Sequence, residues 1–364
     1  MAWSSSKYTP NRIANGIKSR IKNCTLPEVR LWCQDFQNNQ RYATAEKKFL
    51  VVRHAREGGR AYDIILDWLT ENLPDIRALF ELRQVNCRIR DWSPYILHVP
   101  WLQDPVQQWS PKAYLQANSL AAKCDDHKIP IINRVDRHLN AVKSTGSYRI
   151  ASTGIRTPKV IPIKDIDHFK ETLLGLSLPL FVREDWGHGG RIFRADRMDQ
   201  IRDMDLGSFS HPIAVEFVDT KSKLDGFYRK YRYTVAGDEG VTSSIHIQKS
   251  WIVRGKHCEF SEAIREEELG FINNPDPNHE KLLRARKALD LDFVAFDYSY
   301  DPEGQLVVWE ANPYPTIHFP KSTGKRAYRK PAVERALAAI VKMYLKKSGL
   351  PVHPRLDEIL HIHK

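Results

Sequence analysis

The chain has 364 residues, of which 42% are hydrophobic, and it carries a formal net charge of +12. No stretch approaches the roughly 20 apolar residues that span a bilayer, so no membrane association is expected. The length predicts two or three packed units, and the positive charge favours anionic small molecules such as nucleotides and carboxylates. Nucleic acid is not expected as the main partner, because the basic residues are interspersed with acids and the one dense run, 321–330, is short.

The five cysteines are scattered and include no CxxC pair. This usage argues against a disulfide framework and a structural zinc site, and it predicts a reducing compartment, the cytoplasm. The first 22 residues lack the apolar core of a secretory signal, although their basic, acid-free composition leaves a mitochondrial presequence open. The residues leave the oligomeric state open, a homodimer included.

The first third of the chain alternates between helix and strand patterns. Residues 1–45 have helix-like spacing and predict a helical N-terminal extension. Residues 46–130 predict a small α/β domain, because short apolar runs (48–52, 77–85, 95–102 and 129–133) alternate with amphipathic stretches (61–73 and 113–128). Such alternation favours an open, largely parallel sheet with helices on its faces.

Residues 131–348 predict a second, larger domain, followed by a C-terminal tail over 349–364. In chain order we expect a helix (139–150), strands (178–184 and 212–219), a β-meander (230–255), an irregular loop (266–278), a helix (279–291), a hairpin (293–315) and a helix (331–349). The last helix is expected to end at Gly349, where glycine and then proline stop the helical pattern.

The hairpin carries the strongest indication of chemistry. The turn DPEG joins two apolar strands, so Asp297 and Glu310 should lie close together at the same end. Asn312 is two residues beyond Glu310, and side chains two apart in a strand share a face. Two carboxylates and an amide oxygen are hard ligands of the kind Mg²⁺ prefers. Acids at hairpin ends often face solvent, but here they end very apolar strands, where an unpaired charge is costly.

A glycine-rich turn follows the strand that ends at Glu184. Its sequence is DWGHGGR, in which Gly187, His188, Gly189 and Gly190 could bring backbone N–H groups close to phosphate oxygens. It is neither a Walker A loop nor a dinucleotide fingerprint. Two basic residues support a phosphate site, Arg183 on the preceding strand and Lys143, which precedes the segment TGIRTPK.

Residues 130–345 resemble an ATP-grasp domain, with the first lysine at Lys143 ahead of the Gly154–Pro158 exit. The resemblance implies that the chain is of the α/β class and that its larger domain has the ATP-grasp fold, which is of α+β type. In the chain a small N-terminal α/β domain precedes a two-lobed domain, the smaller lobe covers about 150–215, and the nucleotide lies between two sheets. The residues it assigns to ATP are Lys143, Arg183, Gly187, His188, Gly189, Gly190, Glu216, Phe217, Val218 and Asp225, with Asp219 as an alternative to Asp225.

The resemblance also implies ATP and Mg²⁺ as cofactors, with Mn²⁺ as an alternative ion. It assigns Asp297, Glu310 and Asn312 to the metal and catalytic roles to Arg232 and Asn312. Two features depart from the family pattern: Arg183 stands where a lysine is usual, and PYPTIHFP after Asn312 is unlike the loop of D-alanine–D-alanine ligases, which argues against D-alanine as the substrate.

The implied activity is an ADP-forming ligase that activates a carboxylate as an acyl phosphate for attack by an amine. The substrates would be amino acids, peptides or small metabolites. A kinase acting on a hydroxyl and a non-catalytic nucleotide- or polyanion-binding protein are the alternatives. Candidates for contact with the second substrate are His188, His246, Lys249 and Trp251, and candidates for holding the carboxylate of the acceptor are Arg326 and Arg329.

The string RHARE at 53–57 matches the RHxxE pattern of histidine phosphatases. Those enzymes have glycine directly after the histidine, whereas His54 is followed by Ala55. A phosphatase is therefore not expected.

Overall fold

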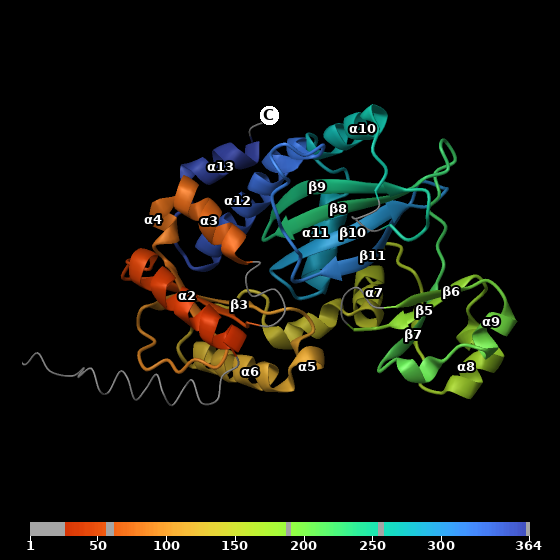
Figure 1. Cartoon of the computed structure of the whole chain (residues 1–364), viewed down its shortest axis with the longest axis horizontal. Helices are drawn as coiled ribbons and strands as arrows, with labels where there is room; N and C mark the ends of the chain where they lie inside the picture. Colours follow the sequence, from red (N-terminus) through yellow and green to blue (C-terminus); the bar gives the residue numbers. More distant parts are fainter. Residues whose placement is uncertain (1–25, 56–61, 187–190, 254–257, 362–364) are drawn as a thin grey trace, which may run out of the picture.

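The computed structural model describes residues 26–55, 62–186, 191–253 and 258–361. Within these ranges the chain is a mixed α/β protein whose strands form three separate sheets (Figure 1). The predicted α/β class is confirmed. None of the described helices combines the length and the apolar character that crossing a membrane requires.

The N-terminal sheet has three parallel strands in the order β2-β1-β3, which confirms the predicted parallel pairing. Its strands are β1 (Lys48–Arg53), β2 (Phe80–Gln84) and β3 (Tyr95–Trp101). The helices around it are α2 (Leu26–Tyr42), α3 (Asp63–Asn72), α4 (Pro74–Arg77), α5 (Val106–Trp109) and α6 (Pro111–Asp126). β1 is apolar almost throughout because both of its faces are covered: Phe49 and Val51 join one core, and Leu50 and Val52 another.

The central sheet has four antiparallel strands in the order β11-β10-β8-β9. Its strands are β8 (Tyr228–Ala236), β9 (Glu239–Gln248), β10 (Phe293–Tyr300) and β11 (Leu306–Asn312). Around it lie α10 (Glu262–Ile272), α11 (His279–Ala288), α12 (Lys330–Lys347) and α13 (Pro354–His361), with a 3₁₀ turn, η6 (Ala327–Arg329), before α12. Gly304 has a φ of +78° in the turn between β10 and β11, a conformation that favours glycine.

One face of the central sheet is apolar along its length and packs on α11. Its side chains include Tyr233, Val294 and Phe296, which share a core with Leu282 and Leu289. Each such buried side chain contributes roughly 1.5–3 kcal/mol relative to exposure.

The opposite face of the central sheet changes character along the strands. At one end Ala236, Val241 and Phe293 join the core shared by α12 and the N-terminal sheet. The other end of this face carries charged side chains, described with the site below.

The small sheet has four antiparallel strands in the order β4-β7-β5-β6 and lies apart from the other two at the lower right of Figure 1. Its strands are β4 (Val160–Pro162), β5 (Leu180–Glu184), β6 (Ile192–Ala195) and β7 (Pro212–Glu216). The short helices near it are α8 (Ile166–Thr172), α9 (Met198–Arg202) and the 3₁₀ turns η3 (Leu173–Gly175) and η4 (Leu206–Ser208). Leu180 and Val182 of β5 pack with Phe169 and Ile201 of these helices. Phe181 and Arg183, which alternate with them, point to the opposite face.

Several local expectations are wrong. Residues 129–133 form an isolated bridge between Ile131 and His98 and not a strand. The segment expected as an irregular loop at 266–278 begins inside α10, whose N-cap Ser261 accepts a hydrogen bond from Ile264 N. The helix expected from 139 begins at Lys143, as α7 (Lys143–Ala151), after a 3₁₀ turn, η2 (Val135–Ala141). The expected C-terminal tail contains α13, which buries Leu356 and Ile359.

Candidate functional site

The charged end of the central sheet arises from strand register. Asp297 lies opposite Glu310 on one side and opposite Arg232 on the other, so all three share a face. This confirms the hairpin prediction for Asp297 and Glu310. The same register places four more polar residues on this face, namely Lys230, Ser244, His246 and Asn312.

Asp297 is the centre of this group and is fully buried. Its carboxylate accepts hydrogen bonds from Arg232 Nε at 2.8 Å, Arg232 Nη2 at 3.0 Å and Lys230 Nζ at 2.9 Å. Burial by itself would raise the pKa of Asp297, but the charges of Arg232 and Lys230 outweigh it and hold that pKa well below its usual value. The acid is therefore ionised and held between two cations.

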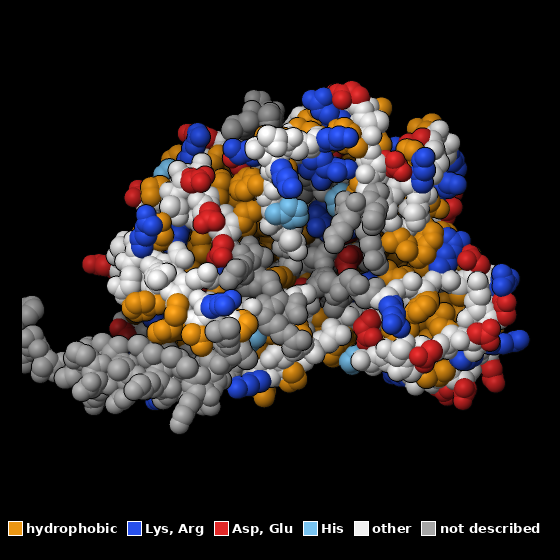
Figure 2. All heavy atoms as spheres, in the orientation of Figure 1, with side chains coloured by type: hydrophobic (Ala, Val, Ile, Leu, Met, Phe, Trp, Pro, Cys, Tyr) orange, Lys and Arg blue, Asp and Glu red, His pale blue; other side chains and the backbone are white. Residues whose placement is uncertain are grey.

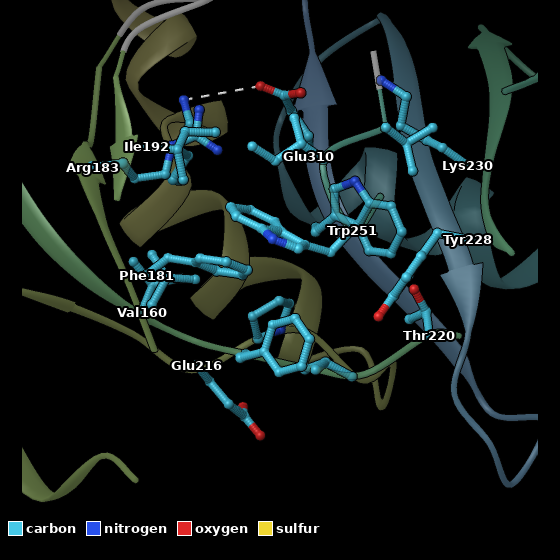
Figure 3. Close-up of a pocket in the computed structure, with 18 of the residues that line it drawn as sticks. Val160, Phe181, Arg183, Ile192, Glu216, Thr220, Tyr228, Lys230, Trp251 and Glu310 are labelled. Atoms are coloured by element: carbon cyan, nitrogen blue, oxygen red, sulfur yellow. Dashed lines mark ion pairs between the residues drawn. The ribbon is translucent and has the colours of Figure 1, made fainter. Parts of the chain in front are cut away.

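A cavity of about 470 Å³, here called the inter-sheet cavity, lies between this charged face and the small sheet. The small sheet contributes Phe181 and Arg183, and the central sheet contributes Lys230 and Glu310 (Figure 3). Arg232 of the central sheet also lines it. Its charged lining residues are Lys143, Arg183, Lys230, Arg232, Glu216 and Glu310. Its apolar and aromatic lining residues include Val160, Phe181, Ile192, Val215, Phe217, Trp251 and Ile252.

Lys143 enters the charged part of the inter-sheet cavity from the first turn of α7. Its Nζ lies 3.9 Å from Glu310 Oε1, the ion pair dashed in Figure 3, and donates to the Asp185 carbonyl at 3.4 Å. Burial and then the charge of Arg183 lower the pKa of Lys143. Asp185 also accepts from Ser144 N at 2.8 Å, which satisfies a free N–H in the first turn of α7. The turn after β5 is thereby tied to the helix that presents Lys143.

The aromatic part of the inter-sheet cavity joins the two sheets. Trp251, which follows β9, stacks on Phe181 of β5 with ring centroids 4.6 Å apart. Arg194 of β6 lies over Phe217, 4.3 Å from its centroid. The Glu216 side chain turns away from the cavity in Figure 3 and accepts from Lys159 N at 2.9 Å, so Glu216 lines the cavity without its carboxylate.

A second cavity of about 570 Å³ adjoins the first, and Arg232 and His246 line both. Its other walls are the segment after β11 and the start of α12, including Ile317, Phe319, Lys321, Lys325, Arg326, Arg329 and Val333. Burial and then the charge of Lys230 lower the pKa of His246 to about 3, so its imidazole is neutral near pH 7. Among the described residues its buried Nδ1 has no hydrogen-bond partner.

Most of the site residues expected from the sequence meet at these cavities. The predicted residues that line the inter-sheet cavity are Lys143, Arg183, Glu216, Phe217, Val218, Arg232 and Glu310. Asp297 and Asn312 are buried on the charged face of the central sheet. Gly187, His188, Gly189 and Gly190 lie outside the described residues. Among the residues predicted to contact the substrates, Trp251 lines the inter-sheet cavity and His246 lines both cavities. Arg326 and Arg329 line the second cavity. The Lys249 ammonium lies over the ring of Phe227.

Asp225 does not line the inter-sheet cavity. Its carboxylate forms an ion pair with Arg229, Oδ2 to Nη2 at 2.6 Å, and Arg229 also pairs with Glu267. Asp219 does not line the cavity either; its carboxylate accepts from Lys221 N. Thr220 and Tyr228, both labelled in Figure 3, line the cavity in this part of the chain.

Arg53 and His54, the first two residues of the RHARE string, have structural roles. Arg53 is 1% exposed, and its guanidinium forms ion pairs with Asp35 and Asp63. His54 packs on Trp109 with ring centroids 4.9 Å apart. The guanidinium that would bind phosphate in a phosphatase is therefore engaged inside the fold.

Sequence reasoning missed Lys230, Phe181 and Asp185. Lys230 alternates with Arg232 in the run YRKYRY, so period-two spacing would have placed both cations on one face. Phe181 likewise alternates with the buried residues of β5. Asp185 follows β5 without any local pattern, and its role depends on contact with α7 forty-one residues earlier in the chain.

The donor set on the charged face fits a divalent ion such as Mg²⁺. Asp297 is ionised, and Glu310 and Asn312 add a carboxylate and an amide oxygen on the same face. Within the described ranges no group of three or more His, Cys, Asp and Glu side chains is arranged to hold a metal. The third donor of the present set is instead an amide oxygen, that of Asn312.

No protein-family model matches the sequence, and no curated protein matches it. Solved structures do match. A D-Ala:D-Ser ligase, VanG from Enterococcus faecalis, is 13% identical with a TM-score of 0.53, over 84% of this chain and 100% of that chain. A D-alanine–D-alanine ligase from Bacillus anthracis is 12% identical with a TM-score of 0.52, over 86% of this chain and 99% of that chain. The D-alanine–D-alanine ligase from Coxiella burnetii is 9% identical with a TM-score of 0.53, over 84% of this chain and 96% of that chain. At these low identities, the structural similarity shows a shared fold and nothing about substrates.

Proposed function

Since this chain has the ATP-grasp fold of those ligases, we propose that it binds MgATP in the inter-sheet cavity and activates a carboxylate for attack by an amine. The observation that carries the proposal is the division of that cavity. Lys143, Arg183 and Lys230 converge where polyphosphate would lie, while Phe181 and Trp251 offer stacking surfaces for a purine.

The roles of individual residues follow from their positions. Lys143, Arg183 and Lys230 neutralise the phosphates, and backbone groups of Glu216, Phe217 and Val218 meet the adenine. Arg232 and Asn312 are the proposed catalytic residues. Arg232 lines both cavities, so its guanidinium can contact a phosphoryl group that passes from one to the other.

Asp297, Glu310 and Asn312 are the residues that would hold Mg²⁺. When bound, the ion supplies positive charge that neutralises phosphate oxygens and orients them. Asp297 already accepts from Arg232 and Lys230. We propose that the side chains of Arg232 and Lys230 would turn toward the nucleotide phosphates if Asp297 became a ligand of the metal.

The reaction is proposed in two steps. An oxygen of the acceptor carboxylate attacks the γ-phosphorus, the bond to the β-phosphate oxygen breaks, and ADP leaves. The amine nitrogen then attacks the carbonyl carbon of the acyl phosphate, inorganic phosphate leaves, and the amine releases a proton to solvent. The second cavity would hold the acceptor, because it opens onto the inter-sheet cavity at Arg232 and His246.

Product analysis tests this function against its alternatives. The purified chain is incubated with MgATP and pools of carboxylic acids, with and without pools of amines, and ADP and AMP are quantified. Amine-dependent ADP formation is the expected result. A stable phosphorylated product without an amine requirement would favour the hydroxyl kinase. No ATP consumption, with Asp297→Asn and Glu310→Gln indistinguishable from the parent chain, would leave a non-catalytic nucleotide- or polyanion-binding protein.

We also propose the division into a helical extension (1–45), a small α/β domain (46–130), the ATP-grasp domain (131–348) and a C-terminal segment (349–364). Its support is that the N-terminal sheet lies within the second range and the other two sheets lie within the third.

A further inference from the structure

The second cavity has an unusual charge distribution. Five of the residues that line it are cations, Arg232, Lys321, Lys325, Arg326 and Arg329, and among the described residues no Asp or Glu lines it. Figure 2 shows Lys and Arg side chains gathered in a recess below α10 on this face of the molecule. Grouping like charges in a recess is costly unless an anion binds there.

Among the described residues, two of these cations are paired with an acid. Arg232 is paired with Asp297, and Arg329 with Glu268, whose carboxylate is 2.7 Å from Arg329 Nη2. Within the described part of the chain, Lys321, Lys325 and Arg326 form no ion pair with a carboxylate. Arg326 instead donates to the backbone carbonyls of Cys258 and Glu259, which orients its guanidinium.

The wall combines these cations with apolar side chains. Arg232 is at the junction with the inter-sheet cavity, whereas Lys325 and Arg326 follow β11 by more than ten residues and flank the ring of Phe260. The wall also includes Pro315, Ile317, Phe319, Val333 and Ala336. The first turn of α12 contributes Ala332 and Val333 to the wall.

We propose that the acceptor is a diacid. Its reacting carboxylate lies at Arg232 and His246, its apolar body lies along Ile317 and Phe319, and a second acidic group, carboxylate or phosphate, binds Lys325 and Arg326. This inference rests on the proposed function for the identity of the reacting group. The second acidic group rests on the cavity alone.

Calorimetry on the full chain with Mg²⁺ and a non-hydrolysable ATP analogue tests the proposal. The probes are succinate, glutarate and adipate, their monomethyl esters, and phosphonopropionate. At least one diacid is expected to bind about tenfold or more tightly than its monoester, because a charge-assisted contact to a cation is lost in the ester. Preference for the phosphonate over the dicarboxylates would identify a phosphorylated acceptor, and the reverse a dicarboxylate.

Two variants and a matched control locate the second acidic group. Lys325→Met and Arg326→Gln should each weaken diacid binding about 10- to 100-fold and leave monoester and ADP binding unchanged. Lys330→Met removes an exposed cation that lies close in the chain and does not line the cavity, and it should change nothing. Lys325 is exposed, so its variant stays informative even if Arg326→Gln disturbs the loop it anchors.

The proposal is overturned if every monoester binds as tightly as its diacid, or if Lys325→Met leaves diacid affinity unchanged. Its failure can be told apart from failure of the ligase proposal. Tight diacid binding without ADP formation would refute the ligase and retain the diacid site. Amine-dependent ADP formation with monoacids alone would refute the diacid site and retain the ligase.

Discussion

Arg232 and Asp297 face each other across β8 and β10, and the guanidinium donates to both carboxylate oxygens. Lys230, two residues before Arg232, donates to the same acid. A fully buried carboxylate therefore balances two cations at the wall of the inter-sheet cavity. Under the proposed function a change at this acid should alter stability, metal binding and nucleotide binding together, which makes it the most informative position to test.

Asp297→Asn keeps the shape of the side chain and removes its charge. Two cations are then left without their buried partner, and we expect the free energy of unfolding to fall by about 3 kcal/mol. The affinity for ADP should also lose its dependence on Mg²⁺. Urea denaturation and calorimetry with and without Mg²⁺ measure the two effects. Asp290→Asn, which breaks an exposed ion pair with Arg137, is the control and should cost less than about 1 kcal/mol. A Mg²⁺ dependence that survives in Asp297→Asn would contradict the metal assignment.

Lys143→Met should raise the Kd for ADP about 10- to 100-fold, because a charge-assisted contact to phosphate is lost. Lys143→Arg keeps the charge and should be less affected. Lys164→Met, an exposed lysine near the small sheet, serves as control. Equal Kd values for Lys143→Met and the parent chain, measured by calorimetry, would remove Lys143 from the nucleotide site.

Trp251 should report nucleotide binding through its fluorescence, because its ring stacks on Phe181 inside the inter-sheet cavity. We expect ADP to change the emission of the parent chain and of Trp32→Phe, which alters α2 far from the cavity in the fold. The change should be smaller in Trp251→Phe, in which Trp309 still lines the cavity. Trp251→Ala should weaken ADP binding about tenfold, the loss expected for one aromatic stack. An undiminished emission change in Trp251→Phe would argue against this placement of the purine.

His246 should make stability depend on pH. Burial and the neighbouring Lys230 lower its folded pKa to about 3 from the ordinary 6.5, so between these values the unfolded chain binds a proton that the folded chain does not. Stability therefore rises with pH through this window and is lost as pH falls below about 6.5, by at most about 1.4 kcal/mol per pH unit for this group. His246→Gln should flatten the slope of unfolding free energy against pH. Buried His98, with a pKa lowered to about 4, still contributes in the variant, so some slope remains. Identical slopes in both proteins would show that His246 is not the group responsible.

Local patterns were sufficient for much of the site. The spacing of Asp297, Glu310 and Asn312 around a tight turn predicted their shared face, because a hairpin's register follows from the length of its loop. The strands that carry Arg183 and Arg232 were predicted from alternation. Where local patterns failed, at 129–133 and 266–278, an apolar run and a run of acids each had two compatible structures, and tertiary packing chose between them.

Long-range relationships could not be predicted in the same way. The contact of Asp185 with α7, the stacking of Trp251 on Phe181 and the pairing of Arg229 with Glu267 each join segments whose approach no local spacing specifies. The second cavity exists because the segment after β11 packs against α12 and beside β9.

The sequence by itself determined which residues share a strand face, since side-chain direction follows from the two-residue period of the backbone. It thereby determined the acids and several of the cations of the candidate site. Only the tertiary structure decided that the small sheet covers this face and that two cavities meet at Arg232 and His246. It also decided that Lys321, Lys325 and Arg326 line a cavity to which the described ranges contribute no Asp or Glu. Those outcomes depend on how the three sheets pack, and packing is set by contacts between segments far apart in the chain.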